Sequence, residues 1–191
     1  MLSNTSTRAF YPSDGFVISC GTVPLDLSCN KILMIRMRST NEMFLPKGRK
    51  NENECLKAAA LRESYEETGY SATILPLKVP TYATNRTGDR EHEEPIAVTQ
   101  RVKDGVLKII FWYAASVNSQ EVPTQGTQQE GEDFEAVWME CTQALAALTF
   151  NDDKEVAQLA IDAAFDPHHV NKSVTTSPFH SVERSLDHEK A

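Results

Sequence analysis

Short apolar segments rich in β-branched and aromatic residues recur along the chain and are typical of β-strands. The predicted strands occupy residues 16–20, 31–38, 71–77, 95–102, 106–117 and 134–139. The segment 106–117 is apolar at nearly every position, which favours a strand buried on both faces. Lys103-Asp104-Gly105 separates it from the preceding strand and predicts a hairpin turn.

Three segments show the apolar spacing of helices. The first, Glu54–Thr68, is rich in Ala and Leu at helical spacings, and Gly69 follows at the position of a C-terminal cap. Thr142 is a suitable N-terminal cap for a short second helix that ends at Leu148. The third, Asp152–Phe165, carries an apolar stripe along one side.

These elements predict a mixed β-sheet covered by helices on both faces, which is a three-layer α/β/α sandwich of the α+β class. One domain is expected at 15–165, because a chain of 191 residues with 40% hydrophobic residues can form one sizeable core. The N-terminal segment 1–14 and the polar segment 166–191 are expected to be flexible tails.

Charge and cysteine content narrow the class of function and the compartment. A formal net charge of −8 argues against a protein whose main partner is a nucleic acid. The four cysteines lie apart, without metal-binding spacing, and indicate reduced thiols. The start lacks an apolar signal segment, and no stretch approaches the ~18 apolar residues of a membrane span. The cytoplasm is therefore the expected compartment, with the nucleus left open and no membrane partner.

Three glutamates crowd one face of the first predicted helix. Glu63, Glu66 and Glu67 stand at i, i+3 and i+4, so their like charges destabilise the helix by about 0.2–0.5 kcal/mol per pair. They also lie near the helix C-terminus, where the helix dipole is negative. A divalent cation such as Mg²⁺ or Mn²⁺, which prefers hard oxygen ligands, would remove this repulsion. A solvated acidic face is the alternative that the spacing leaves open.

The spacing of fixed residues around these glutamates resembles the Nudix box, G-x5-E-x7-R-E-U-x-E-E-x-G-U, in which U is a bulky aliphatic residue. The matching residues are Gly48, Glu54, Arg62, Glu63, Glu66, Glu67 and Gly69. Ser64 and Tyr70 depart from the pattern at the two U positions, which are packing positions, so no ligand is lost. The order of predicted elements from Phe16 to Phe165 also resembles the Nudix sandwich.

The resemblance implies a hydrolase that depends on Mg²⁺ or Mn²⁺ and cleaves a diphosphate joined to another group. The groups implied as metal ligands are the Gly48 carbonyl, Glu63, Glu66 and Glu67. Glu63 would serve either as a ligand or as the base that takes a proton from the attacking water. Arg62 would orient Glu54 or Glu63, so these three are the candidate catalytic residues.

Pro46-Lys47-Gly48 breaks the strand pattern and predicts a loop, which would carry the Gly48 metal ligand. Positive side chains near this predicted metal loop are candidate ligands for a polyanionic substrate, with ordinary solubility as the alternative. These candidates are Arg36, Arg38, Lys47, Arg49 and Lys50. A late polar loop offers further carboxylates that could reach the metal, or is simply a polar loop: Glu130, Glu132 and Asp133. Arg86 and Arg90, in an earlier polar loop, are weaker candidates for gating the substrate.

Several substrates fit this pattern. Pro46-Lys47-Gly48, in place of Pro-Gly-Gly, is similar to the sequence in enzymes that act on diadenosine polyphosphates and in mRNA decapping enzymes. The nearby cations also suit diphosphoinositol polyphosphates, whose hydrolases share the fold. Hydrolysis of an mRNA cap or another nucleoside diphosphate derivative is the alternative, although a long RNA needs an extended basic track. A Nudix-fold binding module without catalysis is the alternative of another class.

The expected partner is therefore a phosphate-rich small molecule. No nucleic acid is expected as a partner, and the sequence identifies no protein partner.

Overall fold

The computed structural model describes residues 8–84 and 90–165. Its elements are β1 (Phe16–Asp26), β2 (Lys31–Met37), β3 (Met43–Phe44), β4 (Lys47–Arg49), α1 (Leu56–Thr68), β5 (Thr73–Ile74), β6 (Ala97–Lys103), β7 (Val106–Ser116), β8 (Phe134–Glu140), α2 (Cys141–Ala147) and α3 (Asn151–Phe165). The predicted tail at 166–191, residues 1–7 and Arg86 lie outside the described residues. Within the described ranges, no helix is long and apolar enough to cross a membrane.

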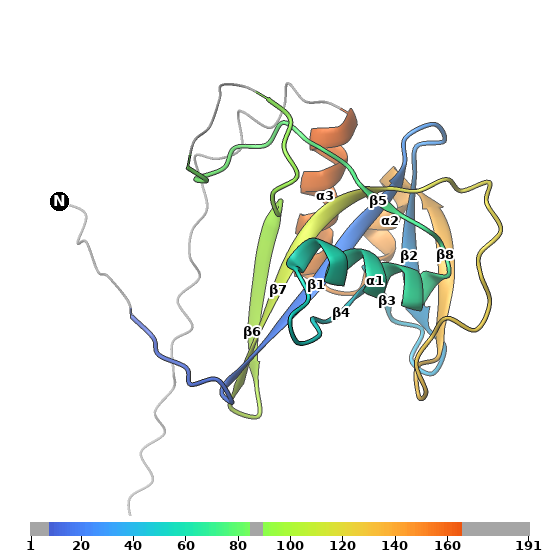
Figure 1. Ribbon diagram of the computed structural model, residues 1–191. Coiled ribbons are helices and arrows are strands. Elements are labelled where there is room, and N and C mark those ends of the chain that lie inside the picture. Colours follow the sequence, from blue (N-terminus) through green and yellow to red (C-terminus); the bar gives the residue numbers. More distant parts are fainter. Residues whose placement is uncertain (1–7, 85–89, 166–191) are drawn as a thin grey trace, which may run out of the picture.

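A mixed sheet forms the middle layer of the molecule (Figure 1). Its main order is β3-β2-β1-β7-β5, with β4 paired to β1, β6 to β7 and β8 to β2. The β1–β7 pair is parallel, and the other pairs are antiparallel. Helix α1 covers one face of the sheet, and α2 and α3 cover the other. The predicted α/β/α sandwich is therefore confirmed.

Side chains of β1 alternate between the two layers of helices. Val23 and Leu25 pack in the larger core cluster with Val156 of α3. Cys20 packs in a separate cluster with Ala59 of α1. Because side chains alternate along a strand, the odd-numbered residues of β1 point to what we call the α3 face of the sheet. The even-numbered residues point to the α1 face.

The two departures from the box pattern are both buried where α1 packs on the sheet. Ser64 is buried, and its hydroxyl accepts a hydrogen bond of 3.0 Å from the hydroxyl of Thr22 on β1. Tyr70 packs edge to face against Trp138, with ring centroids 5.4 Å apart. Gly69 between them has a φ of 76°, so the predicted glycine cap ends the helix. A polar pair thus takes the place of an aliphatic contact beneath α1.

Strand β1 is longer than its sequence predicts, since it continues from Cys20 to Asp26. Gly21 and Pro24 are poor strand formers and obscure the pattern. Pairing with β7 nevertheless runs without interruption from Phe16 to Leu25. Tertiary pairing therefore overrides the local preference of these residues.

Two further predictions about local structure are wrong. Lys47–Arg49 is a short strand paired with β1 rather than an open loop. Thr142 is not the N-terminal cap of α2, because the helix begins at Cys141 and Glu140 occupies the cap position without a side-chain bond. Strand β8 runs directly into α2, so no separate capping residue intervenes.

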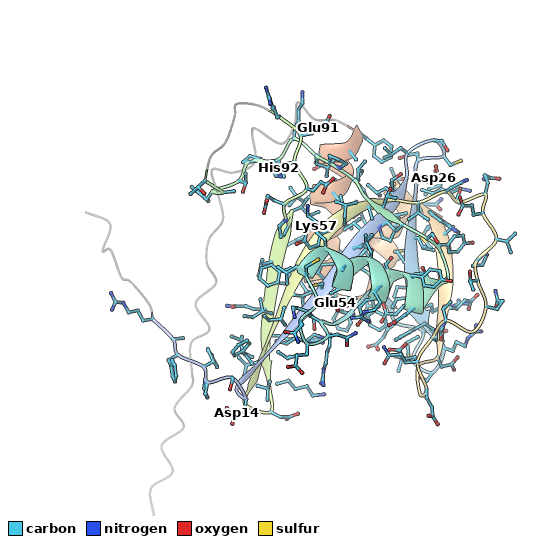
Figure 2. The ribbon with its side chains drawn as sticks, viewed as in Figure 1. Asp14, Asp26, Glu54, Lys57, Glu91 and His92 are labelled. Carbon is cyan, nitrogen blue, oxygen red and sulfur yellow. The ribbon has the colours of Figure 1, made fainter. Side chains whose placement is uncertain are left out.

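Asp26 fastens the turn after β1 to the loop after β7. Its Oδ1 accepts a hydrogen bond of 3.0 Å from the backbone N–H of Ser28, and its Oδ2 accepts one of 2.8 Å from the backbone N–H of Ser119. Figure 2 shows Asp26 well away from Glu54. Asp26 therefore stabilises the fold at a place remote from the predicted site.

Candidate functional site

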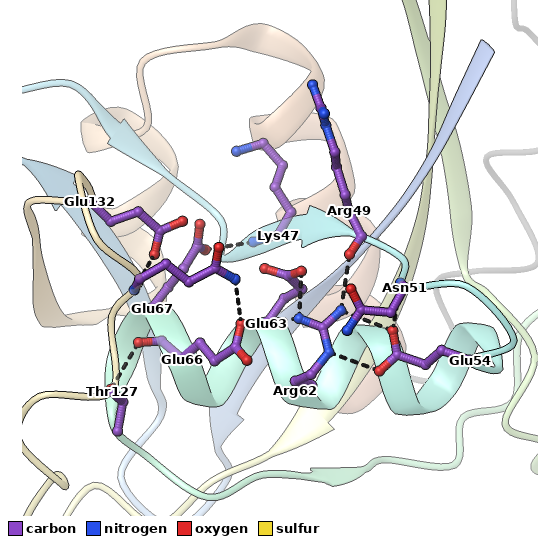
Figure 3. Close-up of polar contacts among 11 residues, drawn as sticks. Lys47, Arg49, Asn51, Glu54, Arg62, Glu63, Glu66, Glu67, Thr127 and Glu132 are labelled. Carbon is purple, nitrogen blue, oxygen red and sulfur yellow. Dashed lines mark hydrogen bonds and ion pairs between the residues drawn. The ribbon is translucent and has the colours of Figure 1, made fainter. Parts of the chain in front are cut away.

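The box residues meet where β4 passes beside α1 (Figure 3). Gly48 faces α1 because it lies opposite Cys20, which packs against that helix. A Cβ built on Gly48 would lie 1.8 Å from Oε2 of Glu63. Glycine is therefore required here, since any side chain would displace the Glu63 carboxylate from the β4 backbone.

Arg62 links the glutamates of α1 to the loop that precedes the helix. Its Nε and Nη2 donate to the two carboxylate oxygens of Glu54 at 2.8 and 2.9 Å. Its Nη1 donates to Glu63 at 2.7 Å and to Glu66 at 3.0 Å. Nη2 also donates to the backbone carbonyl of Arg49 at 2.9 Å. The hydrogen bond from Arg62 lowers the pKa of Glu54, so one guanidinium holds three carboxylates in place.

Glu63 and Glu67 are each only 4% exposed. Burial raises the pKa of Glu67 to about 8, and the charge and backbone N–H of Lys47 offset only part of the rise. That N–H donates to Oε2 of Glu67 at 2.8 Å. Burial also raises the pKa of Glu63, although the hydrogen bond from Arg62 opposes the change. A cation beside these carboxylates would restore their charged form.

The loop between β7 and β8 contacts Glu66 of α1. Gln129 Nε2 donates to Oε2 of Glu66 at 3.0 Å, and the Thr127 hydroxyl donates to the Glu66 backbone carbonyl at 2.8 Å. The sequence gives no sign of these two contacts, because a polar loop has no periodicity from which its position could be predicted. They fix the loop to the last turn of α1.

Among the three late carboxylates, the structure brings Glu132 toward the site. Its negative charge contributes to the raised pKa values of Glu63 and Glu67. Asp133 instead forms an ion pair of 3.0 Å with Arg38, and Glu130 is exposed. In the part of the chain that the structure describes, no three His, Cys, Asp or Glu side chains stand close enough together to hold a metal ion as they lie.

The five predicted cations fall into separate places. Arg36 is ion-paired with Glu135 of β8, and Arg38 is ion-paired with Asp133 and, at 3.9 Å, with Glu135. Lys50 donates to a neighbouring backbone carbonyl at 2.7 Å. Arg36 and Arg38 are therefore ion-paired at or beside β8, whereas Lys47, Arg49 and Lys50 stay beside the metal loop.

The side chains of Lys47 and Arg49 extend from β4 on the side opposite α1 (Figure 3). Lys47 Nζ lies 5.1 Å from the ring centroid of Phe44. Phe44 in turn stacks on Phe150, with centroids 5.7 Å apart and an angle of 14° between the rings. The two phenylalanines are far apart in the chain, so sequence alone could not place this aromatic pair beside a cation.

Comparison with known proteins agrees with the geometry. The family model of the NUDIX domain matches residues 19–160. An Ap4A hydrolase from C. elegans is 17% identical over 75% of this chain and 95% of its own, with a TM-score of 0.54. A NUDIX-family hydrolase from Clostridium perfringens is 21% identical over 76% of this chain and 96% of its own, with a TM-score of 0.53.

A MutT protein from Methanosarcina mazei Go1 is 16% identical over 79% of this chain and 94% of its own, with a TM-score of 0.52. At these identities the solved structures show a shared fold. No curated protein sequence matches the chain significantly. The family match begins within β1 and ends within α3, and every fixed Gly, Glu and Arg of the box is present at its spacing. The chain therefore belongs to the Nudix family of hydrolases.

Proposed function

We propose that this chain is a pyrophosphohydrolase that uses Mg²⁺ or Mn²⁺ to cleave a diphosphate linkage in a phosphate-rich small molecule. Diadenosine polyphosphates and diphosphoinositol polyphosphates are the substrate classes that we favour. One observation carries the proposal: Glu63 and Glu67 are buried beside β4, and burial raises the pKa of both carboxyls more than the nearby positive charges lower it.

The donor atoms of the site suit a divalent metal ion, although the side chains would have to move closer together to hold one. A buried carboxylate with a raised pKa lacks a sufficient counter-ion, and the absent side chain of Gly48 leaves room for the Glu63 carboxylate against the backbone. The groups that would hold the ion are the Gly48 carbonyl, Glu63, Glu66 and Glu67. When bound, the ion would neutralise diphosphate oxygens and increase the acidity of a water molecule.

The remaining work of the site falls to side chains of α1 and the preceding loop. Arg62 would keep Glu54, Glu63 and Glu66 in position while substrate enters and product leaves, because it already bonds to all three. Glu63 would act as a ligand or as the base that accepts a proton from the attacking water. Burial raises the pKa of Glu63, which makes the carboxylate more basic and so favours the second role.

Two features of the described residues support a phosphate-rich substrate. Within those residues, Lys47 and Arg49 form no ion pair with a carboxylate, so their charges are available to phosphates. The Phe44–Phe150 pair beside Lys47 offers an aromatic surface on which an adenine could stack, which favours the diadenosine class. The Ap4A hydrolase from C. elegans shows that this fold can carry such an activity.

The proposal is tested by screening the purified protein against a panel of diphosphates with Mg²⁺ and with Mn²⁺. The panel holds a diadenosine polyphosphate, a diphosphoinositol polyphosphate, ADP-ribose, a nucleotide sugar and a capped RNA. We expect metal-dependent turnover, fastest on one of the first two. Faster turnover of ADP-ribose, the nucleotide sugar or the cap would contradict the phosphate-rich class. No turnover of any member would indicate a binding module.

We place this activity in the cytoplasm, with the nucleus as the alternative. All four cysteines are free thiols, and Cys20 and Cys141 are buried, which fits a reducing compartment. We propose no membrane or nucleic-acid partner for the activity.

A further inference from the structure

Four positive side chains on three strands form what we call the cation patch: Lys47 and Arg49 on β4, Arg101 on β6 and Lys108 on β7. Strand β1 lies between β4 and β7, and β6 pairs with β7 on its other side. Residues that lie directly opposite each other in paired strands share a face of the sheet. Lys47 lies opposite Gly21 of β1, and Arg49 lies opposite Ser19. Lys108 lies opposite Val17 of β1 on one side and Arg101 of β6 on the other. All four cations therefore project from the α3 face.

Gly21 confirms this placement independently of the strand register. A Cβ built on Gly21 would lie 2.5 Å from Cζ3 of Trp112 and 2.7 Å from Cβ of Lys47. Trp112 belongs to the core beneath α3. Lys47 thus stands on the same face as that core, and the missing side chain of Gly21 lets it pack close to Trp112.

The charges of the patch are not neutralised by their surroundings. Within the described part of the chain, none of the four cations forms an ion pair with a carboxylate. Burial lowers the pKa of Lys108 to about 8, and the positive charges of Lys47, Arg101 and Arg49 lower it further. Asp153 of α3 lies within electrostatic reach of Lys47 and Arg101, and burial raises its pKa. Four cations without an ion pair among the described residues therefore stand near this α3 carboxylate, and the patch has an excess of positive charge.

A buried hydroxyl lies in the same place without a partner. Ser19 is fully buried, and among the described residues its Oγ has no hydrogen-bond partner. On the α3 face it stands between Arg49 of β4 and Ile110 of β7. Buried hydroxyl groups are nearly always hydrogen-bonded, so an unpartnered one among cations points to an anionic oxygen as its missing acceptor.

The patch adjoins the carboxylate site across a single strand. Gly48 faces Glu63, while its neighbours Lys47 and Arg49 point to the other side of β4. Strand β4 pairs with β1 and lies at an edge of the described sheet. The charge of Glu67 also reaches Lys108. A substrate whose scissile diphosphate lies at the carboxylates could therefore extend around this edge onto the patch.

We propose that the cation patch, with the Ser19 hydroxyl at its base, binds the phosphate groups of the substrate that lie beyond the scissile diphosphate. This inference rests on the proposed function and names the part of the site that selects phosphate-rich substrates. Several cations on separate strands match several linked phosphates better than a single carboxylate or a neutral sugar. The patch takes the substrate-binding role that the sequence analysis gives to Arg36 and Arg38. These two arginines form ion pairs with Glu135 and Asp133 instead.

The test compares inorganic tripolyphosphate with inorganic pyrophosphate in calorimetric titrations of the full chain. Lys108→Met keeps the length of the side chain without its charge, and Arg101→Gln removes an exposed charge with little risk to folding. Lys57→Met is the matched control. It removes the same charge from α1, outside the patch, where the Lys57 ammonium forms an ion pair of 2.7 Å with Glu93. Each patch variant should weaken tripolyphosphate binding by about tenfold and pyrophosphate binding by less than about threefold, as expected for one lost charge-assisted contact.

The kinetic part of the test uses a diadenosine polyphosphate and a diphosphoinositol polyphosphate separately, so that it also distinguishes linear from ring-bound phosphates. Patch variants should raise KM for the better substrate by about tenfold while kcat stays within about threefold. The inference is overturned if both patch variants bind tripolyphosphate as tightly as the wild type. The proposed function would survive that result, provided that wild-type hydrolysis is intact. If instead the wild type hydrolyses no diphosphate but the variants still lose tripolyphosphate binding, the patch stands and the proposed function fails.

Discussion

Oε2 of Glu63 lies 1.8 Å from the position that a Cβ on residue 48 would take, so the backbone of β4 is part of the site itself. The close approach buries the carboxylate and contributes to its raised pKa. Arg62 then holds the other oxygen of Glu63 at 2.7 Å. At the scale of single residues, the site is therefore a carboxylate held between a glycine and a guanidinium.

Gly48→Ala should lower turnover by about 100-fold with little change in melting temperature, because the added methyl displaces the Glu63 carboxylate but disturbs no core contact. Gly105→Ala is the control, since Gly105 has a φ of 79° and nothing within 4 Å of an added Cβ. Gly105→Ala should lose about 1 kcal/mol of stability and keep its activity. Normal turnover in Gly48→Ala, measured on the best substrate of the panel, would contradict this picture of Gly48.

The spacing of the box predicts which glutamates meet, because i, i+3 and i+4 positions share a helix face. It could not predict that Gln129 approaches them, or which of the three late carboxylates does so, since these residues come from a loop whose path depends on contacts with α1 and β8. Nor could it predict that Arg36 is neutralised by Glu135, because that pairing depends on the register of β2 and β8. Local spacing is readable from sequence, whereas contacts set by register are not.

At the scale of elements, α1 is seated on β1 through a hydroxyl pair rather than an aliphatic side chain. Thr22 donates to Ser64 at 3.0 Å, and both residues are buried. A helix can tolerate this replacement because the buried Thr22 hydroxyl finds its acceptor in the Ser64 hydroxyl. The packing of α1 on β1 therefore depends on two polar groups that must be changed together.

Ser64→Ala should cost about 1–3 kcal/mol of stability, because it leaves the Thr22 hydroxyl buried without a partner. Adding Thr22→Val, which has nearly the same shape, should recover part of that loss. Urea denaturation of the two single variants and the double variant gives the coupling energy, for which we expect about 1 kcal/mol. Strictly additive losses would mean that the two hydroxyls do not stabilise each other.

The elements themselves are largely predictable from periodicity. Alternation and continuous apolar runs identify β2, β6, β7 and β8, and Asp104-Gly105 forms the predicted turn with both residues at positive φ. Strand β4 is missed because three residues with a proline before them carry no pattern, and only pairing with β1 extends them. Short strands of this kind are determined by their neighbours rather than by their own side chains.

For the whole molecule, a net charge of −8 conceals a local concentration of positive charge. Arg101 and Lys108 lie on different strands from Lys47 and Arg49, so the cation patch exists only in the folded register. Composition predicts the absence of an extended basic surface for nucleic acid, but it cannot predict a patch of four residues. Net charge is a sum over the whole chain, so it carries no information about how charges are grouped on the surface.

Protonation of Asp26 should lower the free energy of unfolding in acid. Burial alone would raise its pKa, but hydrogen bonds from Ser119 and Ser28 outweigh burial and hold the pKa well below the ordinary 3.8. A carboxyl with a lowered folded-state pKa stabilises the protein above its unfolded pKa, and the stabilisation is lost as pH falls through the folded pKa. Asp26→Asn should therefore unfold about 1–3 kcal/mol more easily at pH 7.

Urea denaturation from pH 7 to pH 3 checks this prediction. The difference in free energy of unfolding between the wild type and Asp26→Asn should shrink as pH falls below about 4. There the wild type loses the stabilisation that its charged carboxylate provides. Asp14→Asn, at an exposed turn, is the control and should change stability by less than about 0.5 kcal/mol at any pH. If the difference in free energy of unfolding stayed constant with pH, the charged carboxylate of Asp26 would not be the stabilising group.

We infer that the buried glutamates of α1 bind a divalent cation for hydrolysis. The most direct measurement is Mn²⁺ binding by the full chain, followed by electron paramagnetic resonance, alongside turnover of the best diphosphate in the same samples. Glu67→Gln keeps the shape of the side chain but removes its charge, so it should weaken Mn²⁺ binding by about tenfold or more and cut turnover by about 100-fold, with the melting temperature retained. Wild-type Mn²⁺ affinity and near-normal turnover in Glu67→Gln at saturating Mg²⁺ would contradict the claim.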